Sequence, residues 1–117
     1  MHELSIATSV LESVSKTAKE NNAIYVNKVE LVVGTSSAII EEALTEAFSA
    51  LCLLDEYTLF KNCKFLVESK KSISICIDCG VEFSHGIGAH QCPQCRSYNT
   101  QIIQGTDIYI KQIEIEN

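Results

Sequence analysis

The sequence lacks the features that mark membrane-spanning, nucleic-acid-binding or disordered proteins. Its longest apolar runs, such as residues 51–54, are far shorter than the ~18–20 residues that a membrane-spanning helix needs. It has no basic stretch, and 9 Lys and Arg against 15 Asp and Glu give a formal net charge of -6. We therefore expect neither nucleic acid nor a membrane as a partner. One proline, five glycines and 46% hydrophobic residues argue against disorder.

The sequence also shows no export signal, because its start, Met1-His2-Glu3-Leu4, has no basic segment followed by an apolar stretch. We therefore expect a cytoplasmic protein. In that compartment, six cysteines indicate metal ligation or reactivity rather than disulfides. The 117 residues allow one domain, or one small domain that carries a smaller module.

The hydrophobic pattern predicts elements in the order helix, strand, helix, strand, a cysteine-rich segment and a last strand. Apolar residues recur with the period of a helix in residues 4–19 and 40–51, and segments rich in β-branched residues lie at 24–33, 63–68 and 108–115. Thr35-Ser36-Ser37 predicts a side-chain cap at the start of the second helix. We expect the last strand to return to the sheet of the first part.

Residues 76–104 differ in composition, since the helical period disappears and four cysteines appear in two pairs separated by 12 residues. The pairs are Cys76 and Cys79, and Cys92 and Cys95. Two facing C-x2-C turns can complete the tetrahedron that zinc prefers, whereas a thioredoxin-like site needs only one such pair, at a strand–helix junction. This segment has too few large apolar residues for a core of its own. We predict a zinc-ribbon-like module at 71–105, inserted in a domain formed by 1–70 and completed by 106–117.

The other cysteines and histidines have simpler interpretations. His85 and His90 lie between the cysteine pairs and could replace a thiolate ligand, but four thiolates already close the site, which favours solvated loop histidines. A closed site also leaves zinc no position for a reacting water. Cys52 and Cys63 are interpreted as small buried hydrophobic residues.

The N-terminus offers a different set of ligands. The amine of Met1, the first backbone amides and the imidazole of His2 are all nitrogen donors, which suit square-planar Ni(II) or Cu(II). Taken alone, a histidine at the second position is more often just an exposed terminal residue.

Together, these motifs resemble the HypA/HybF family, the nickel metallochaperones of NiFe-hydrogenase maturation, over essentially the whole chain. The motifs that carry the resemblance are Met1-His2-Glu3-Leu4-Ser5, Gly34-Thr35-Ser36-Ser37, Cys76-x2-Cys79-Gly80, Cys92-Pro93-x-Cys95 and Gln104-Gly105-x-Asp107-Ile108. One residue departs from the pattern, because relatives often have glycine where this chain has Arg96.

The resemblance implies an α+β fold, with two helices packed on a small three-stranded sheet that the C-terminal strand completes. It implies that nickel is held by the Met1 amine, by backbone amides near His2 and Glu3, and by the His2 imidazole. It implies zinc on Cys76, Cys79, Cys92 and Cys95, as a structural ion. The partners it implies are a HypB-type GTPase, the hydrogenase large subunit and, since some relatives serve urease, urease accessory proteins.

Two other functions fit the sequence less well. A zinc ribbon that binds nucleic acid needs a basic face, but the charged residues of 76–104 are Asp78, Glu82 and Arg96, a formal sum of -1. An enzyme needs a nucleophile–base pair, a phosphate loop or an open metal site, and the sequence shows no such motif.

Overall fold

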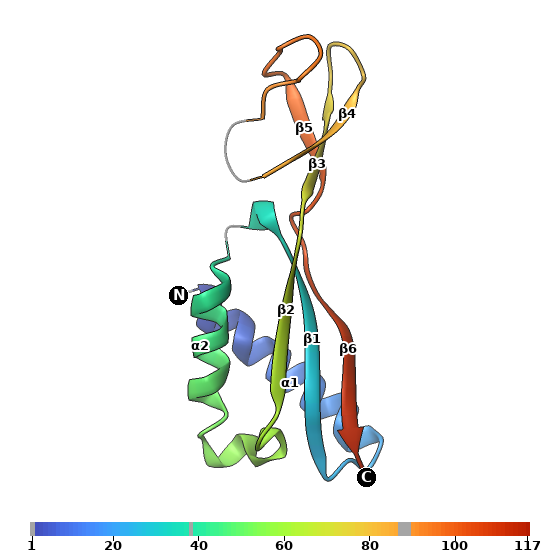
Figure 1. Cartoon of the computed structure of the whole chain (residues 1–117). Helices are drawn as coiled ribbons and strands as arrows, with labels where there is room; N and C mark the ends of the chain where they lie inside the picture. The colour runs from blue at the N-terminus through green and yellow to red at the C-terminus, as the bar shows by residue number, and fades with distance from the viewer. Residues whose placement is uncertain (1, 38, 87–89) are drawn as a thin grey trace. The chain divides into compact units, whose positions relative to one another are not determined.

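The computed structural model describes residues 2–37, 39–86 and 90–117, and the chain divides into two compact units (Figure 1). Unit 1 comprises Met1–Leu31, Ile39–Glu68 and Tyr109–Asn117. Unit 2 comprises Val32–Ala38 and Ser69–Ile108. The unit that contains the four paired cysteines is therefore an insertion in the other.

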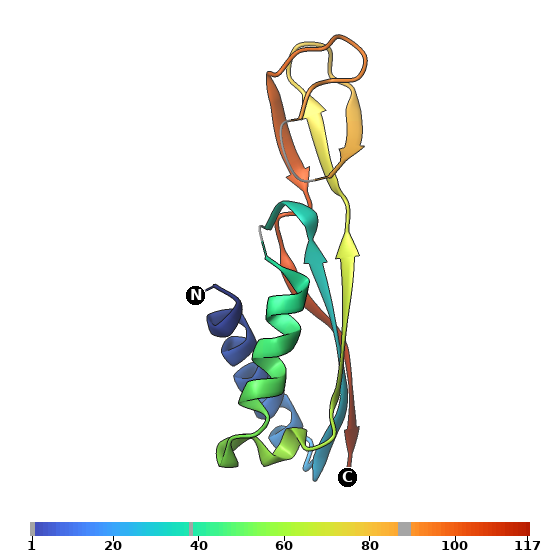
Figure 2. The same ribbon diagram turned by 60° about the vertical axis from the view of Figure 1, so that its left-hand side comes forward.

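Two helices and a three-stranded sheet, in the order β2-β1-β6, form the first part of the fold. Figure 2 shows both helices on the same side of the strands. Ile24 donates a backbone hydrogen bond to Glu116 at 2.6 Å, which places the start of β1 beside the end of β6. The elements are α1 (His2–Glu20), β1 (Tyr25–Gly34), α2 (Glu41–Leu51), β2 (Lys64–Lys70) and β6 (Ile108–Glu116). None of the helices in the described part of the chain is long and apolar enough to cross a membrane.

The core of unit 1 consists of large apolar side chains from these helices and strands. On α1 the buried residues recur at helical spacing, because one stripe of the helix faces the sheet. The ring of Phe48 stacks on that of Phe65, with centroids 4.3 Å apart. The fully buried side chains of this core include Ala7, Leu11, Ala18, Val26, Val29, Leu44 and Phe48.

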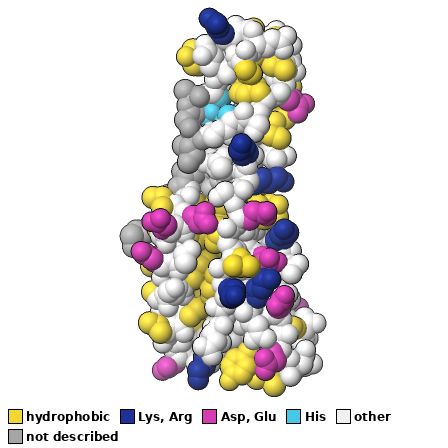
Figure 3. Space-filling model, in the orientation of Figure 1, with side chains coloured by type: hydrophobic (Ala, Val, Ile, Leu, Met, Phe, Trp, Pro, Cys, Tyr) yellow, Lys and Arg dark blue, Asp and Glu magenta, His cyan; other side chains and the backbone are white. Residues whose placement is uncertain are grey.

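Charged residues cover part of the solvent-facing surface of unit 1. Lys28 lies 3.7 Å from the carboxylates of both Glu30 and Glu114, and Lys111 lies 3.6 Å from Glu68. Figure 3 shows acidic and basic side chains interspersed over the strands of this unit.

The predicted architecture is confirmed, since two helices pack on a three-stranded sheet and the last strand returns to it.

The predicted side-chain cap of the second helix is wrong. Residues Thr35–Ser37 form a short 3-10 helix, and α2 begins only at Glu41, after Ile40, without a hydrogen bond from a capping side chain. The hydroxyls of Thr35 and Ser36 instead contact the Ser72 hydroxyl. A second 3-10 helix, Asp55–Phe60, is an element that the sequence analysis did not predict.

Unit 2 contains a second three-stranded sheet, of order β4-β3-β5, which the sequence analysis also did not predict. Both pairings are antiparallel, with Ser72 opposite His85 on one side of β3 and Cys76 opposite Thr100 on the other. This register places Cys76, the start of the first cysteine pair, at the end of β3 and beside the start of β5. The strands are β3 (Ser72–Cys76), β4 (Glu82–His85) and β5 (Thr100–Gln104).

Three distant segments meet around Ser72 in unit 2. The buried Ser72 hydroxyl lies 2.8 Å from that of Thr35 and 2.5 Å from that of Ser36, and the Ser36 amide donates to the Gly105 carbonyl at 3.0 Å. A Cβ at Gly34 would lie 2.0 Å from that carbonyl oxygen, so only glycine fits there. The Gly-Thr-Ser-Ser and Gln-Gly motifs of the sequence thus form one packed junction.

Candidate metal centres

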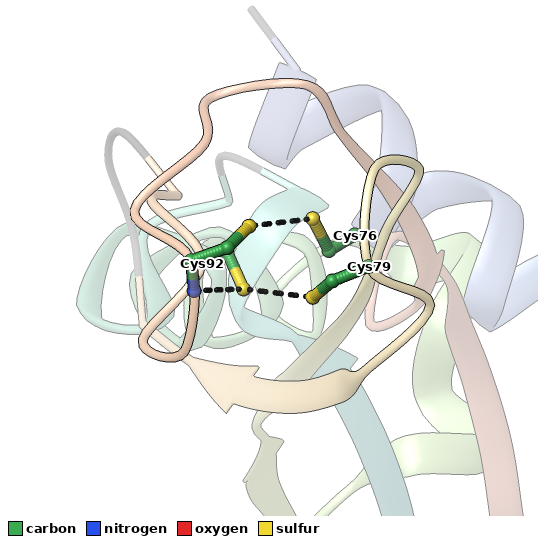
Figure 4. A group of neighbouring side chains, drawn as sticks. Cys76, Cys79 and Cys92 are labelled. Atoms are coloured by element: carbon green, nitrogen blue, oxygen red, sulfur yellow. Dashed lines mark hydrogen bonds between the residues drawn. The ribbon is translucent and has the colours of Figure 1, made fainter.

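Two loops of unit 2 bring four cysteines together. Cys76 ends β3 and Cys79 follows in the turn, while Cys92 and Cys95 lie in the loop before β5. The Sγ atoms of Cys76 and Cys95 are 3.5 Å apart. Those of Cys79 and Cys92 are also 3.5 Å apart (Figure 4). All four sulfurs lie within 4.8 Å of one another. Among the residues that the structure describes, this is the one group of side chains whose ligand atoms lie close enough together to hold a metal ion.

The sulfur spacing fits a tetrahedral zinc ion. Four sulfurs at ~2.3 Å from a central ion lie about 3.8 Å from one another in a regular tetrahedron, close to the spacing observed. Sulfurs joined in a disulfide lie only about 2.05 Å apart, and all four cysteines are free thiols. The residues present therefore suit a Zn(Cys)4 site that has no open position for water.

The two cysteine turns share one backbone conformation. In the first, the Gly80 amide donates to the Cys76 carbonyl at 2.8 Å; in the second, the Arg96 amide donates to the Cys92 carbonyl at 2.9 Å. Gly80 has a φ of 80° and Arg96 a φ of 62°, both in the left-handed region. Arg96, which departs from the family pattern, thus adopts the conformation that glycine adopts in the first turn, at the cost that a side chain adds there.

Backbone amides favour the thiolate at one of the four positions. The amide of Cys95 donates to the Cys92 Sγ at 3.4 Å, and it and the Gln94 amide lower the pKa of the Cys92 thiol to about 6, although burial opposes this shift. A bound dication would deprotonate the remaining thiols as well. Cys76 and Cys92 are buried, whereas Cys79 and Cys95 are exposed, so an ion is reached from the side of Cys79 and Cys95.

A carboxylate that the sequence did not single out, that of Asp78, connects the two cysteine turns. Asp78 lies between the cysteines of the first turn and accepts hydrogen bonds from the Ser97 hydroxyl and the Asn99 amide, both just beyond the second turn. These two bonds lower the pKa of the Asp78 carboxyl. No local sequence signal indicates this role of Asp78, because its partners lie 19 and 21 residues away in the sequence.

The two histidines between the cysteine pairs lie close to each other but outside the group of four sulfurs. The rings of His85 and His90 have centroids 4.0 Å apart. His85 Nε2 lies 2.6 Å from the buried Ser74 hydroxyl and Nδ1 lies 2.8 Å from the Gly86 carbonyl, so both ring nitrogens have partners in the protein. The Nδ1 atom of His90 is buried and has no partner among the described residues.

Two of the residues expected to bind nickel, His2 and Glu3, begin α1. Met1 is outside the described residues, and the structure describes the backbone of His2 but not its side chain. The Glu3 carboxylate accepts a hydrogen bond from the Ile40 amide at 3.3 Å, just before α2. Because α1 begins at His2, the amides of its first turn have no carbonyl acceptor within the helix.

Cys52 and Cys63 are free thiols in unit 1, away from these centres. Burial raises the pKa of Cys63 to about 12, with a smaller contribution from Cys52, and burial also raises the pKa of Cys52. Both therefore remain protonated and weakly nucleophilic near neutral pH.

The sequence matches the HypA family, described as hydrogenase/urease nickel incorporation, metallochaperone, over residues 1–115. It is 37% identical over 116 residues to the hydrogenase maturation factor HypA of Aquifex aeolicus, covering 99% of this chain and 98% of that protein. It is 34% identical to the HypA of Prosthecochloris aestuarii, covering 99% and 100%.

Two solved structures have similar folds. The solution structure of the Ni metallochaperone HypA from Helicobacter pylori superposes with a TM-score of 0.69 at 24% identity, covering 97% of each chain. Another solution structure, of a HypA protein, gives a TM-score of 0.71 at 26% identity, covering 98% of this chain and 96% of that one.

Proposed function

Because the chain belongs to the HypA family of hydrogenase and urease nickel-incorporation metallochaperones, we propose that it binds Ni(II) at its N-terminus and delivers it during maturation of NiFe hydrogenase, with urease as a further target. The observation that carries this proposal is the family match, which begins at residue 1 and so includes the expected nickel ligands. Nickel is then the cargo of the protein, and zinc a resident structural ion.

The proposed nickel ligands are the Met1 amine, the backbone amides near His2 and Glu3, and the His2 imidazole. Four nitrogen donors of this kind suit square-planar Ni(II). A site at a chain end can also exchange its ligands one by one with those of a partner.

The proposed zinc ligands are Cys76, Cys79, Cys92 and Cys95, and the sulfur spacing described above supports this assignment. When bound, zinc would supply a cross-link between the two cysteine turns rather than a reactive water. In functional terms we divide the chain into a nickel domain, 1–70 with 106–117, and a zinc module, 71–105.

The family's role in maturation implies partners in that pathway. We propose a HypB-type GTPase, the hydrogenase large subunit and urease accessory proteins as those partners. We also propose that the protein has no catalytic turnover and acts in the cytoplasm, where the six free thiols would stay reduced.

Nickel titration of protein with a native and with an extended N-terminus tests the role of the Met1 amine. An extension of several residues converts this amine to an amide and should weaken binding strongly. One added glycine is a misleading control, because it moves the histidine to the third position and creates a new amine–amide–amide–imidazole chelate. Binding through deprotonated amides releases protons, so the affinity of the native protein should rise between about pH 6 and 8, around the reference pKa of an amine.

The His2→Ala variant tests the imidazole. We expect it to abolish nickel binding, with a change in the free energy of unfolding within the ~0.5 kcal/mol typical of surface substitutions. His85→Ala is the matched control, because it removes an imidazole at another place and should leave the nickel affinity unchanged. Equal nickel affinity in native, extended and His2→Ala proteins would place nickel elsewhere and refute the proposal.

A further inference from the structure

Asp78 bridges the two cysteine turns through side chains at both of its oxygens. Its Oδ2 accepts a hydrogen bond from the Ser97 hydroxyl, and its Oδ1 accepts one from Asn99 Nδ2 at 3.1 Å. Asp78 lies 19 and 21 residues from these partners in the sequence. Because hydrogen bonds to an ionised carboxylate are stronger than neutral ones, two of them at one group form a directional link.

Backbone hydrogen bonds connect this link to the cysteines themselves. The Ser97 hydroxyl also accepts from the Asn99 amide at 3.0 Å, and the Ile77 amide donates to the Asn99 carbonyl at 2.9 Å. The Ser97 carbonyl accepts from the amide of Cys92 at 2.9 Å. A continuous path of hydrogen bonds therefore runs from residues 77–78, inside the first cysteine pair, to the start of the second pair. It includes no sulfur atom.

We propose that Asp78 is a positioning residue that holds the two cysteine turns at the separation that zinc requires and so slows the loss of zinc. This inference rests on the proposed Zn(Cys)4 site. The buried side chains of unit 2 are mostly small, including Ser72, Ser74, Cys76 and Cys92, so little apolar packing can hold the turns together when a zinc–sulfur bond opens. The Asp78 network acts at that moment, because it keeps the free thiolate close to the ion and favours rebinding.

The rate of zinc transfer from the intact protein to a chromophoric chelator tests this proposal. We expect Asp78→Ala to release zinc about tenfold faster than the wild type, at the lower end of the effect of residues that support metal ligands. Glu82→Gln is the matched control, because it removes an exposed carboxylate of the same module and should release zinc at the wild-type rate.

An exchange of the side chains at positions 78 and 99 separates a positioning role of Asp78 from a general effect on stability. In Asp78→Asn, an amide faces the Asn99 amide, and zinc release should accelerate. Adding Asn99→Asp restores an amide–carboxylate pair with the roles reversed, and release should return toward the wild-type rate. The absorption spectrum of the Co(II)-substituted variants reports whether four thiolates still bind the ion, so that a variant with a misfolded module is recognised.

The outcomes distinguish this inference from the proposed zinc site. If the wild type binds one zinc but Asp78→Ala releases it as slowly as Glu82→Gln, the positioning role is refuted and the zinc site stands. Failure of the exchange variant to slow the release seen in Asp78→Asn would also refute it. A wild-type protein that binds no zinc would overturn the proposed zinc site, and the role of Asp78 with it.

Discussion

The interiors of the two units differ in kind. Unit 1 buries large apolar side chains, such as Leu11, Leu44, Phe48 and Phe60, whereas the buried side chains described in unit 2 are two valines, two serines and two cysteines. Burial of apolar area stabilises the first unit at about 25 cal/mol per Å². The second has little such area, so under the proposed function its stability depends on zinc and on hydrogen bonds. The chain would thus combine a domain that folds by hydrophobic packing with one that needs an ion.

The thiols of the two units show the same contrast. In unit 1, burial raises the pKa of Cys63 to about 12. In unit 2, backbone amides of Cys95 and Gln94 lower the pKa of Cys92 to about 6. Burial without a charge partner favours the neutral thiol, whereas amides that point at the sulfur favour the thiolate. Cys63 of unit 1 is therefore inert, whereas Cys92 of unit 2 is prepared as a ligand. The pKa values of Cys79 and Cys95 are raised by burial and by hydrogen bonds with the neighbouring thiols, so the preparation is confined to one of the four positions.

Removing one zinc ligand should give the largest effect and affect only unit 2. In Cys92→Ala, we expect loss of zinc and unfolding of the module, because structural zinc contributes about 10–16 kcal/mol of apparent binding free energy. Metal analysis and limited proteolysis check this, with cleavage expected between about Lys71 and Gly105. Cys63→Ala is the control and should keep its zinc. Full zinc content and a protease-resistant module in Cys92→Ala would contradict the four-thiolate site.

Removing a core ring should have the converse effect. Phe48→Ala leaves a cavity beside Phe65 and should lower the free energy of unfolding of unit 1 by about 3–5 kcal/mol, without loss of zinc in native buffer. Urea unfolding followed by far-UV circular dichroism measures the first effect and metal analysis the second. Leu53→Ala, at a side chain 85% exposed, is the control and should change stability by no more than ~0.5 kcal/mol. An equal loss in the two variants would refute the assignment of this core.

A smaller effect is expected where unit 2 depends on close backbone packing. In Gly34→Ala, the new Cβ would overlap the Gly105 carbonyl. The backbone segments around residues 34 and 105 must then separate, and the hydrogen bond from the Ser36 amide to the Gly105 carbonyl must lengthen. Overpacking of this kind costs about 1–3 kcal/mol. Thermal unfolding of the zinc-loaded protein measures the loss. Gly86→Ala is the matched control, since a Cβ there meets no atom within 4 Å. Equal melting temperatures in the two variants would contradict the packed junction.

The contrast between the units also explains what the sequence could predict. The helices, the three strands of the first sheet and the grouping of the four cysteines follow from local periodicity and spacing. The strand β3 reverses the usual pattern, because Ser72 and Ser74 are buried while Ile73 and Ile75 are partly exposed. The sequence predicts that Thr35 and Ser36 cap a helix. Their hydroxyls instead form hydrogen bonds with the hydroxyl of Ser72, which lies 36 or 37 residues away in the sequence. Such long-range hydrogen bonds leave no local signal, and the Asp78 network is another example.

The raised pKa of Cys63 predicts a pH dependence confined to unit 1. The unfolded chain loses this proton near pH 8.5, but the folded chain retains it up to about pH 12. The contribution of this thiol to stability is therefore fully present below about pH 8.5 and is lost as the pH rises toward 12. Urea unfolding between about pH 8 and 10 should show a steeper decline in wild type than in Cys63→Ala. Identical slopes would show that this thiol titrates normally in the folded protein.

The smallest expected effect concerns the residue that follows each cysteine pair, which is Gly80 in the first turn and Arg96 in the second. Arg96 has a left-handed φ of 62°, which costs a residue with a Cβ about 1–2 kcal/mol, whereas glycine adopts it freely but loses more entropy on folding. The difference leaves Arg96→Gly more stable by about 0.5–1 kcal/mol, measured as a higher melting temperature of the zinc-loaded protein. The reciprocal variant, Gly80→Arg, should lose a similar amount, because Gly80 has a φ of 80° and open space around it. If both changes left the melting temperature unaltered, the shared conformation of the two turns would not contribute to the stability of unit 2. Stabilisation by Arg96→Gly without a slower release of zinc would show that this turn supports the fold rather than retention of the ion.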